Sequence, residues 1–248
     1  MLARTVFGGY ILAAGLSASS LATAQPSPWS WGIGVVGSED VYTDYDSRVI
    51  PVPMIVYNGD RLHLFGPYVT YDVYRPGDVT VSALLNPVFA GYKASDSPVL
   101  EGMDTRHYSM AAGVGVAYRP GRWALSTDIV HDLLGVNEGY ESETSVSYVF
   151  PLGSIFIEPG IGMTFQSQDY VDYYYGVREG EARSWRPQYS PGSNINHNIS
   201  LTFISNRIAG GSTRLQITRT TYGDEITESP LTSGKHSLGV NLLFGKAF

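Results

Sequence analysis

Apolar side chains occupy every second position along most of this chain. Between Ser109 and Tyr118 the even positions carry Met, Ala, Val, Val and Tyr, whereas the odd positions carry only Ser, Ala and Gly. A period of two belongs to β-strands, because successive side chains of a strand point to opposite faces of the sheet. The segments 154–166, 194–203 and 237–248 alternate in the same way. We therefore expect an all-β protein with one continuous domain.

The face opposite the apolar one distinguishes a soluble sheet from a membrane sheet. A soluble β-sandwich carries Lys, Glu and Asp freely on its water-facing side, but here that side is mostly Gly, Ala, Ser, Thr and Asn. Charged residues collect between the strands instead. A Lys or Arg facing lipid at the bilayer midplane costs about 2–4 kcal/mol, which explains their scarcity on the apolar faces. The pattern predicts a transmembrane, antiparallel, up-and-down β-barrel.

The number of strands depends on one segment. A direct count gives eleven alternating segments, at 30–40, 48–57, 61–75, 78–92, 107–118, 122–132, 140–150, 154–167, 194–206, 212–222 and 236–248. Bacterial barrels have an even number. In 61–75 the apolar residues change from even to odd positions at Gly66-Pro67, which indicates either a bulge or a turn. A turn there gives twelve strands, which we expect, with ten as the alternative.

The connections alternate between short and long. Short turns are expected at 119–122, 151–154 and 206–212, and longer connections at 92–106, 133–140, 169–193 and 222–235. Outer-membrane barrels place their short turns in the periplasm and their long loops outside the cell. Both ends of the barrel domain are then expected on the periplasmic side.

The first 24 residues have the layout of a secretory signal peptide. Arg4 precedes an apolar stretch at 5–18, and Ala22-Thr23-Ala24 supplies the small residues of a cleavage site. We expect cleavage near Ala24, a barrel domain at 25–248, and a Gram-negative outer-membrane location. The formal net charge of −7 argues against a nucleic-acid partner. With no cysteine, the chain has no disulfide and no thiolate metal site, and no cofactor is expected.

Several motifs together resemble the MltA-interacting protein (MipA/OmpV) family of outer-membrane proteins. They are SPVLEGMDTRHYSMAAG at 97–113, DLLGVNEGY at 132–140, YYYGVREGEA at 173–182, ESPL at 228–231, and the closing Phe248. The family's elements are L-x-G-M-x-x-R, YYGV followed by E-A, and a late S-P-L. The residues matching them, taken as candidate binding residues, are Leu100, Gly102, Met103, Arg106, Tyr174, Tyr175, Gly176, Val177, Glu181, Ser229 and Pro230, with Ala182 and Leu231 completing the motifs.

The resemblance implies a non-enzymatic barrel and a set of partners. It implies a scaffold between a murein-cleaving lytic transglycosylase and a murein-synthesising enzyme, and other members are linked to stress and adhesion. The outer-membrane lipid and lipopolysaccharide are the expected surroundings. Phe248 resembles the C-terminal signal by which such barrels are recognised for membrane assembly. A small-solute pore and a lipid-modifying hydrolase are the competing functions.

Several polar groups are candidate sites. Histidines 63, 107, 131, 197 and 236 lack a G-x-S-x-G element, so we expect no catalytic residue. The acidic residues between 39 and 46 lack the spacing of an EF-hand, and we expect an exposed loop bridged by divalent ions to lipopolysaccharide rather than a structural metal site. These residues are Glu39, Asp40, Asp44 and Asp46.

Two further groups of polar and aromatic residues each allow two interpretations. Asp72, Asp128, Glu158 and Arg214 are expected in the lumen, either lining a pore or pairing across a filled barrel. The tyrosines 173–175, and arginines 106, 178, 183 and 186 with glutamates 179 and 181, are expected to fold a loop in preference to binding a ligand.

Overall fold

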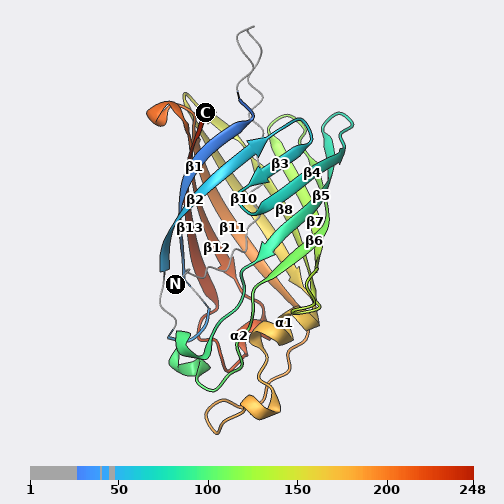
Figure 1. Ribbon diagram of the computed structural model, residues 1–248, viewed down its shortest axis with the longest axis vertical. Helices are drawn as coiled ribbons and strands as arrows, with labels where there is room; N and C mark the ends of the chain where they lie inside the picture. Colours follow the sequence, from blue (N-terminus) through green and yellow to red (C-terminus); the bar gives the residue numbers. More distant parts are fainter. Residues whose placement is uncertain (1–26, 40, 45–47) are drawn as a thin grey trace.

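The strands form one antiparallel sheet that closes on itself (Figure 1) in the computed structural model, which describes residues 27–39, 41–44 and 48–248. The last strand, β13 (His236–Ala247), pairs with β12 (Ser212–Thr221) on one side and with β1 (Trp29–Ser38) on the other. The wall is therefore a closed barrel. The predicted signal peptide at 1–24 lies outside the described residues.

The remaining strands follow one another around the wall in chain order. They are β2 (Arg48–Asn58), β3 (Leu62–Phe65), β4 (Tyr68–Tyr74), β5 (Val79–Val88), β6 (Ser109–Tyr118), β7 (Trp123–Asp132), β8 (Tyr140–Tyr148), β9 (Phe150–Leu152), β10 (Ile155–Gln166) and β11 (Asn194–Ser205). Only Val149 separates β8 from β9, and both pair with β10, so they form one wall strand. The wall thus has twelve strands.

The phase change at Gly66-Pro67 is a turn. It joins β3 to β4, which pair with each other from Leu62–Tyr71 to Phe65–Tyr68. Gly66 has a φ of +55°, a conformation that glycine adopts without steric cost. The expectation of twelve strands is therefore confirmed, and the ten-strand alternative is wrong. The strand expected at 78–92 is shorter than predicted, because β5 ends at Val88.

The apolar faces point outward along the wall. Val114, Ile161 and Ile199 are 55%, 60% and 64% exposed, as residues facing lipid should be when lipid is not counted. On the inner face Thr164, Asn196 and Thr202 are buried. This is the orientation that the alternation predicted, since lipid covers the outer side of a membrane barrel and the polar side faces its lumen.

The long connections contain helices that the alternation did not predict. The largest is α1 (Gln168–Tyr175), whose N-cap, Ser167, accepts a hydrogen bond from the backbone N–H of Tyr170. The others are α2 (Asp224–Thr227) and the 3₁₀ helices η1 (Ala94–Asp96), η2 (Pro98–Leu100), η3 (Glu179–Glu181) and η4 (Ile208–Gly210). Within the described ranges, none of the helices is long and apolar enough to cross a membrane.

Candidate functional site: the cap over one end of the barrel

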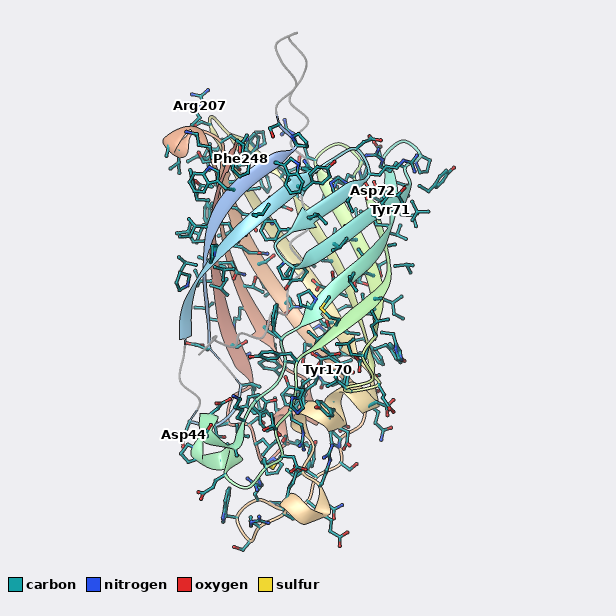
Figure 2. All side chains as sticks on the ribbon, viewed as in Figure 1. Asp44, Tyr71, Asp72, Tyr170, Arg207 and Phe248 are labelled. Atoms are coloured by element: carbon teal, nitrogen blue, oxygen red, sulfur yellow. The ribbon has the colours of Figure 1, made fainter. Side chains whose placement is uncertain are left out.

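The long connections fold together into a cap with its own buried core. Its side chains come from the connections after β1, β5, β10 and β12, which leave the wall at separate places around its rim. A single cluster shared by these connections must bridge the mouth of the barrel. Figure 2 shows Asp44 and Tyr170 at this end, opposite Arg207 and Phe248. The cluster contains Val41, Tyr42, Ala90, Tyr92, Leu100, Met103, Tyr170, Val171, Tyr174, Tyr175, Val177, Ile226 and Leu231.

A buried ion pair crosses the cap. The guanidinium of Arg106 donates to both carboxylate oxygens of Glu181, with Nη1–Oε1 and Nη2–Oε2 distances of 2.8 Å each. Their side chains are 1% and 6% exposed. Arg106 also donates to the carbonyls of Tyr173 and Asp104, at 2.6 and 3.1 Å. Such two-point pairing fixes the relative orientation of the two side chains and strengthens their interaction. The pair therefore ties the connection after β5 to the connection after β10.

A second arginine binds backbone carbonyls in place of a carboxylate. Arg186 is fully buried and donates to the carbonyl oxygens of Val99, Glu101 and Glu181 at 2.5, 3.1 and 2.7 Å. These carbonyls belong to the two connections that Arg106 and Glu181 join. Of the arginines that could meet Glu179 or Glu181, Arg186 instead donates to backbone carbonyls.

Hydroxyl groups donate hydrogen bonds to the backbone carbonyls at the C-terminal end of α1. The hydroxyl of Tyr42 donates to the carbonyl of Tyr174 at 2.9 Å, and the hydroxyl of Ser229 donates to the carbonyl of Tyr175 at 2.7 Å. The last carbonyls of a helix have no partner within the helix, so each of these bonds satisfies a group that burial would otherwise penalise. The connections after β1 and β12 are thereby fastened to α1.

The environment of Glu181 favours its charged form. Burial raises the pKa of a carboxyl, but the hydrogen bonds from Arg106 and from the backbone N–H groups of Arg178 and Asp104 outweigh that effect and hold the pKa of Glu181 at about 2. The carboxylate is therefore ionised at neutral pH.

We expect the stability of the cap to fall at acid pH through this group. The pKa in the folded cap lies below the usual 4.5, so the contribution of Glu181 is complete above pH 4.5 and is lost as the pH falls toward 2. Near-UV circular dichroism during denaturant unfolding measures the midpoint of the cap at each pH. The midpoint gap between the wild type and Glu181→Gln should narrow from about pH 5 to about pH 2, and a constant gap would contradict the assignment.

The residues of the family motifs lie mostly inside the cap. Leu100, Met103, Arg106, Tyr174, Tyr175, Val177, Glu181 and Ser229 are all buried, Gly176 ends α1, Pro230 is half-buried and Gly102 is exposed with a φ of +78°. The expectation that tyrosines 173–175 fold a loop agrees with this placement, although they lie on a helix. A role for these residues in binding a partner stays a prediction.

The sequence did not single out Tyr42, Tyr92 and Ile226, which are central to the cap core. They lie in connections with no alternation, and no motif marked them as buried. One signal was present in α1, where the buried Tyr170, Val171, Tyr174 and Tyr175 recur at helical spacing.

The polar residues of the lumen do not form one site. Asp72 contacts His63 (Oδ2–Nε2, 3.1 Å) and Ser82 (Oδ1–Oγ, 2.8 Å), so the carboxylate stands between the hydroxyl and the imidazole. A hydrolytic triad requires the imidazole in the middle. Glu158 accepts from Ser147 at 2.7 Å and lines, together with Arg214, a lumen cavity of about 360 Å³.

The acidic connection after β1 is only partly within the described residues, which exclude Asp40 and Asp46. Across 27–39, 41–44 and 48–248, no three His, Asp or Glu side chains are grouped to hold a metal ion.

A family model for MltA-interacting protein MipA matches residues 31–248, which is nearly the whole described chain. The chain belongs to this family. It is an outer-membrane β-barrel of the MipA family, as its motifs indicated.

Relatives in this family have diverged considerably in sequence. The MltA-interacting protein of Escherichia coli K12 is 30% identical over 220 residues, covering 86% of this chain and 88% of the relative. The outer membrane protein Omp26La of Vibrio anguillarum is 28% identical over 211 residues, covering 82% and 80%. Among solved structures, an outer membrane channel of Pseudomonas putida F1 aligns with a TM-score of 0.49 at 13% identity, covering 91% and 97%.

Proposed function

We propose that this barrel is a scaffold whose short-turn end holds a murein enzyme in the periplasm. The observation that carries the proposal is membership of the family, together with a relative named as an MltA-interacting protein that aligns along most of both chains. The position of the cap supports the short-turn end of the barrel as the surface that binds the enzyme. Its core closes the outer mouth, which leaves the short turns as the surface that the periplasm can reach.

The short-turn end has a positive surface, although the chain as a whole is acidic. Its basic residues are Arg61, Arg75, Arg119, Arg122 and Arg207 in the turns, and Lys246 near the end of β13, against Asp60 and Asp78. The long connections carry an excess of acidic residues. Charge complementarity steers association and selects partners. The short-turn end is therefore suited to a partner with an acidic surface.

The arginines of this end differ in their contacts. Arg75 pairs with Asp60 at 2.7 Å, and Arg61 donates to the carbonyl of Val73 at 3.1 Å, so both help to fix the turns. Arg122 and Arg207 are exposed, on turns at different places around the rim. These two are the better candidates for contacting a partner.

We expect folded, detergent-solubilised protein to retain a purified lytic transglycosylase at physiological salt. The double variant Arg122→Glu/Arg207→Glu should weaken this binding about tenfold or more, because it places negative charge opposite the acidic partner. The matched control is Lys93→Glu/Lys235→Glu, which reverses two exposed lysines of the cap and should bind as the wild type does. Surface plasmon resonance measures both. If the wild-type barrel retains no enzyme, the scaffold proposal is wrong.

A further inference from the structure

The sheet of the barrel wall is interrupted between β2 and β5. The β3–β4 hairpin lies between these strands but is short, and pairs with only 56–58 of β2 and 81–85 of β5. Beyond its turn at Gly66-Pro67, no described strand pairs with the free edge of β2 from Arg48 to Met54. At about 3.3 Å per residue this edge extends for about 20 Å. Figure 1 shows β3 and β4 ending part-way along the wall while β2 continues. We call this interruption the wall window.

The wall window is bounded on its remaining side by the cap. The hydroxyl of Ser97 donates to the carbonyl of Thr43 at 2.6 Å, and the rings of Tyr42 and Tyr92 pack edge to face at 5.1 Å. These contacts join the connection that precedes β2 to the connection that follows β5. The wall window therefore lies in the half of the barrel next to the cap. With the cap proposed to face outward, this half is at the depth of the outer leaflet.

Proline nitrogens lie along both edges of the wall window. In an antiparallel strand, alternate residues direct their N–H and C=O groups to opposite neighbours. The N–H of Asn58 bonds to Pro28, on the β1 side, whereas the carbonyl of Ile55 bonds to Gly66, on the hairpin side. Odd residues of β2 thus face the wall window, and these include Pro51 and Pro53.

The same reasoning applies to β5. The carbonyl of Asp78 accepts from Arg119, on the β6 side, so the odd residues of β5 face the hairpin and, beyond it, the wall window. Pro87 is one of them. Proline has no N–H, so three donors that would otherwise point into hydrocarbon without a partner are removed. A partner strand would need these donors to pair, and natural edges use proline to prevent such pairing. The edges of the wall window are therefore built to stay unpaired.

Two long apolar side chains on the lumen side of β2 and β5 lean away from the wall window. A Cβ placed on Gly34 would lie 3.0 Å from Cε of Met54, and one on Gly115 would lie 3.2 Å from Cδ1 of Leu84. Met54, on β2, thus lies over β1, and Leu84, on β5, lies over β6. Both strands are on the far side from the wall window.

One polar group in this region has a free donor. Asn86 on β5 faces the lumen, is 4% exposed, and its Nδ2 has no hydrogen-bond partner in the described part of the chain. A buried amide without an acceptor is costly, so the site suits a ligand that brings one. Asp132 faces the lumen at the same level, because Ala111 pairs with both Asn86 and Asp132. Its negative charge disfavours a carboxylate ligand.

We propose that the wall window admits an apolar molecule with a neutral oxygen acceptor, such as the ester of a medium-chain fatty acid, from the outer leaflet into the lumen. There Asn86 donates to the acceptor oxygen while Met54 and Leu84 contact the chain. This is a binding site separate from the scaffold function, and it uses the opposite half of the barrel.

Cysteine labelling tests the proposal, because the chain has no cysteine of its own. Ala111→Cys places a thiol in the lumen beside Asn86, and Thr164→Cys places a similarly buried thiol on β10, away from the wall window. In liposomes, N-(1-pyrenyl)maleimide dissolved in the bilayer should label the first several times faster than the second. A sulfonated, water-soluble maleimide added outside should label neither, since the cap covers that end.

Competition identifies the ligand class. Methyl dodecanoate should protect Ala111→Cys from the pyrenyl reagent, and dodecanoate at about pH 8, where it is ionised, should protect it less. Adding Asn86→Leu should weaken the ester's protection about threefold to tenfold, the effect of losing one neutral hydrogen bond. Met54→Trp should slow labelling, because the larger side chain fills lumen space behind the wall window. Unheated mobility in gel electrophoresis confirms that each variant is folded.

Several outcomes would overturn the proposal. The wall window is closed if the bilayer reagent labels both thiols at the same rate or labels neither. The ligand class is wrong if the ester gives no protection with Asn86 intact. If a photo-crosslinking residue at position 51 captures a polypeptide in native membranes, a partner strand fills the opening instead.

Discussion

Replacing Arg106 with leucine is expected to unfold the cap while leaving the barrel closed. The change leaves the carboxylate of Glu181 buried without its partner, and removing one member of a buried ion pair typically costs about 3–5 kcal/mol. It also removes the donors that satisfy the carbonyls of Tyr173 and Asp104. The closure of the wall depends on strand pairing between β13 and β1, far from this pair, so the loss should be confined to the cap.

Proteolysis from outside the cell measures this effect. Proteinase K should cut the connections of Arg106→Leu and spare the strands, which keep their heat-modifiable mobility in gel electrophoresis. Arg183→Leu is the control, because Arg183 is exposed and, within the described residues, its guanidinium donates only to the nearby carbonyls of Gly180 and Ala182. In planar bilayers Arg106→Leu should conduct where the wild type carries no steady current.

The double variant Arg106→Leu/Glu181→Leu separates the ion pair from simple packing. Replacing both members of a buried pair with apolar residues is often neutral or stabilising. Protection from proteinase K should therefore return in part. If Arg106→Leu alone resists the protease as the wild type does, the pair does not hold the cap.

An arginine at position 161 should destabilise the barrel strongly. Ile161 lies in the middle of β10 on the outer face, opposite Val146 and Ile199 on the neighbouring strands. At the bilayer midplane an arginine facing lipid costs about 2–4 kcal/mol. Urea unfolding in phospholipid vesicles, followed by tryptophan fluorescence, measures the free energy of unfolding for Ile161→Arg.

Ile155→Arg is a depth control on the same strand and the same face. Ile155 begins β10 next to the short turn at Gly153, where the wall meets the membrane interface, so its substitution should cost only about 0–1 kcal/mol. Equal losses at the two positions would mean that lipid does not cover this face.

The wall was largely predictable because each strand's pattern reflects its own surroundings. Alternation reports which side chains face lipid, and the turn at Gly66-Pro67 follows from a change of phase that only a reversal or a bulge produces. The sequence also contains a signal for the wall window, because Pro51 and Pro53 within an alternating segment are typical of a strand edge without a pairing neighbour. The pattern did not predict that the β3–β4 hairpin is shorter than the neighbouring strands β2 and β5.

The cap was less predictable because its contacts join distant segments. Arg106 and Glu181 are 75 positions apart. The connections contain several arginines and glutamates, and their spacing in the sequence does not indicate which of them form an ion pair. The helix α1 was missed because tyrosine favours helices only weakly, and its stability comes from burying four side chains in the cap. The motifs correctly marked which residues matter there, but their spacing does not say what they touch.

The pairing of the first and last strands also governs how this polypeptide can be made. The backbone N–H of Phe248 bonds to the carbonyl of Trp29, and the neighbouring register runs from Ser30–Ala247 to Ser38–Gly239. Ring closure thus waits for the final residues to be synthesised and delivered, and its entropic cost is that of joining the two extremes of the domain. A translation product that stops short of β13 would form an open sheet with two unpaired edge strands. Such a sheet is prone to aggregate before it reaches the bilayer.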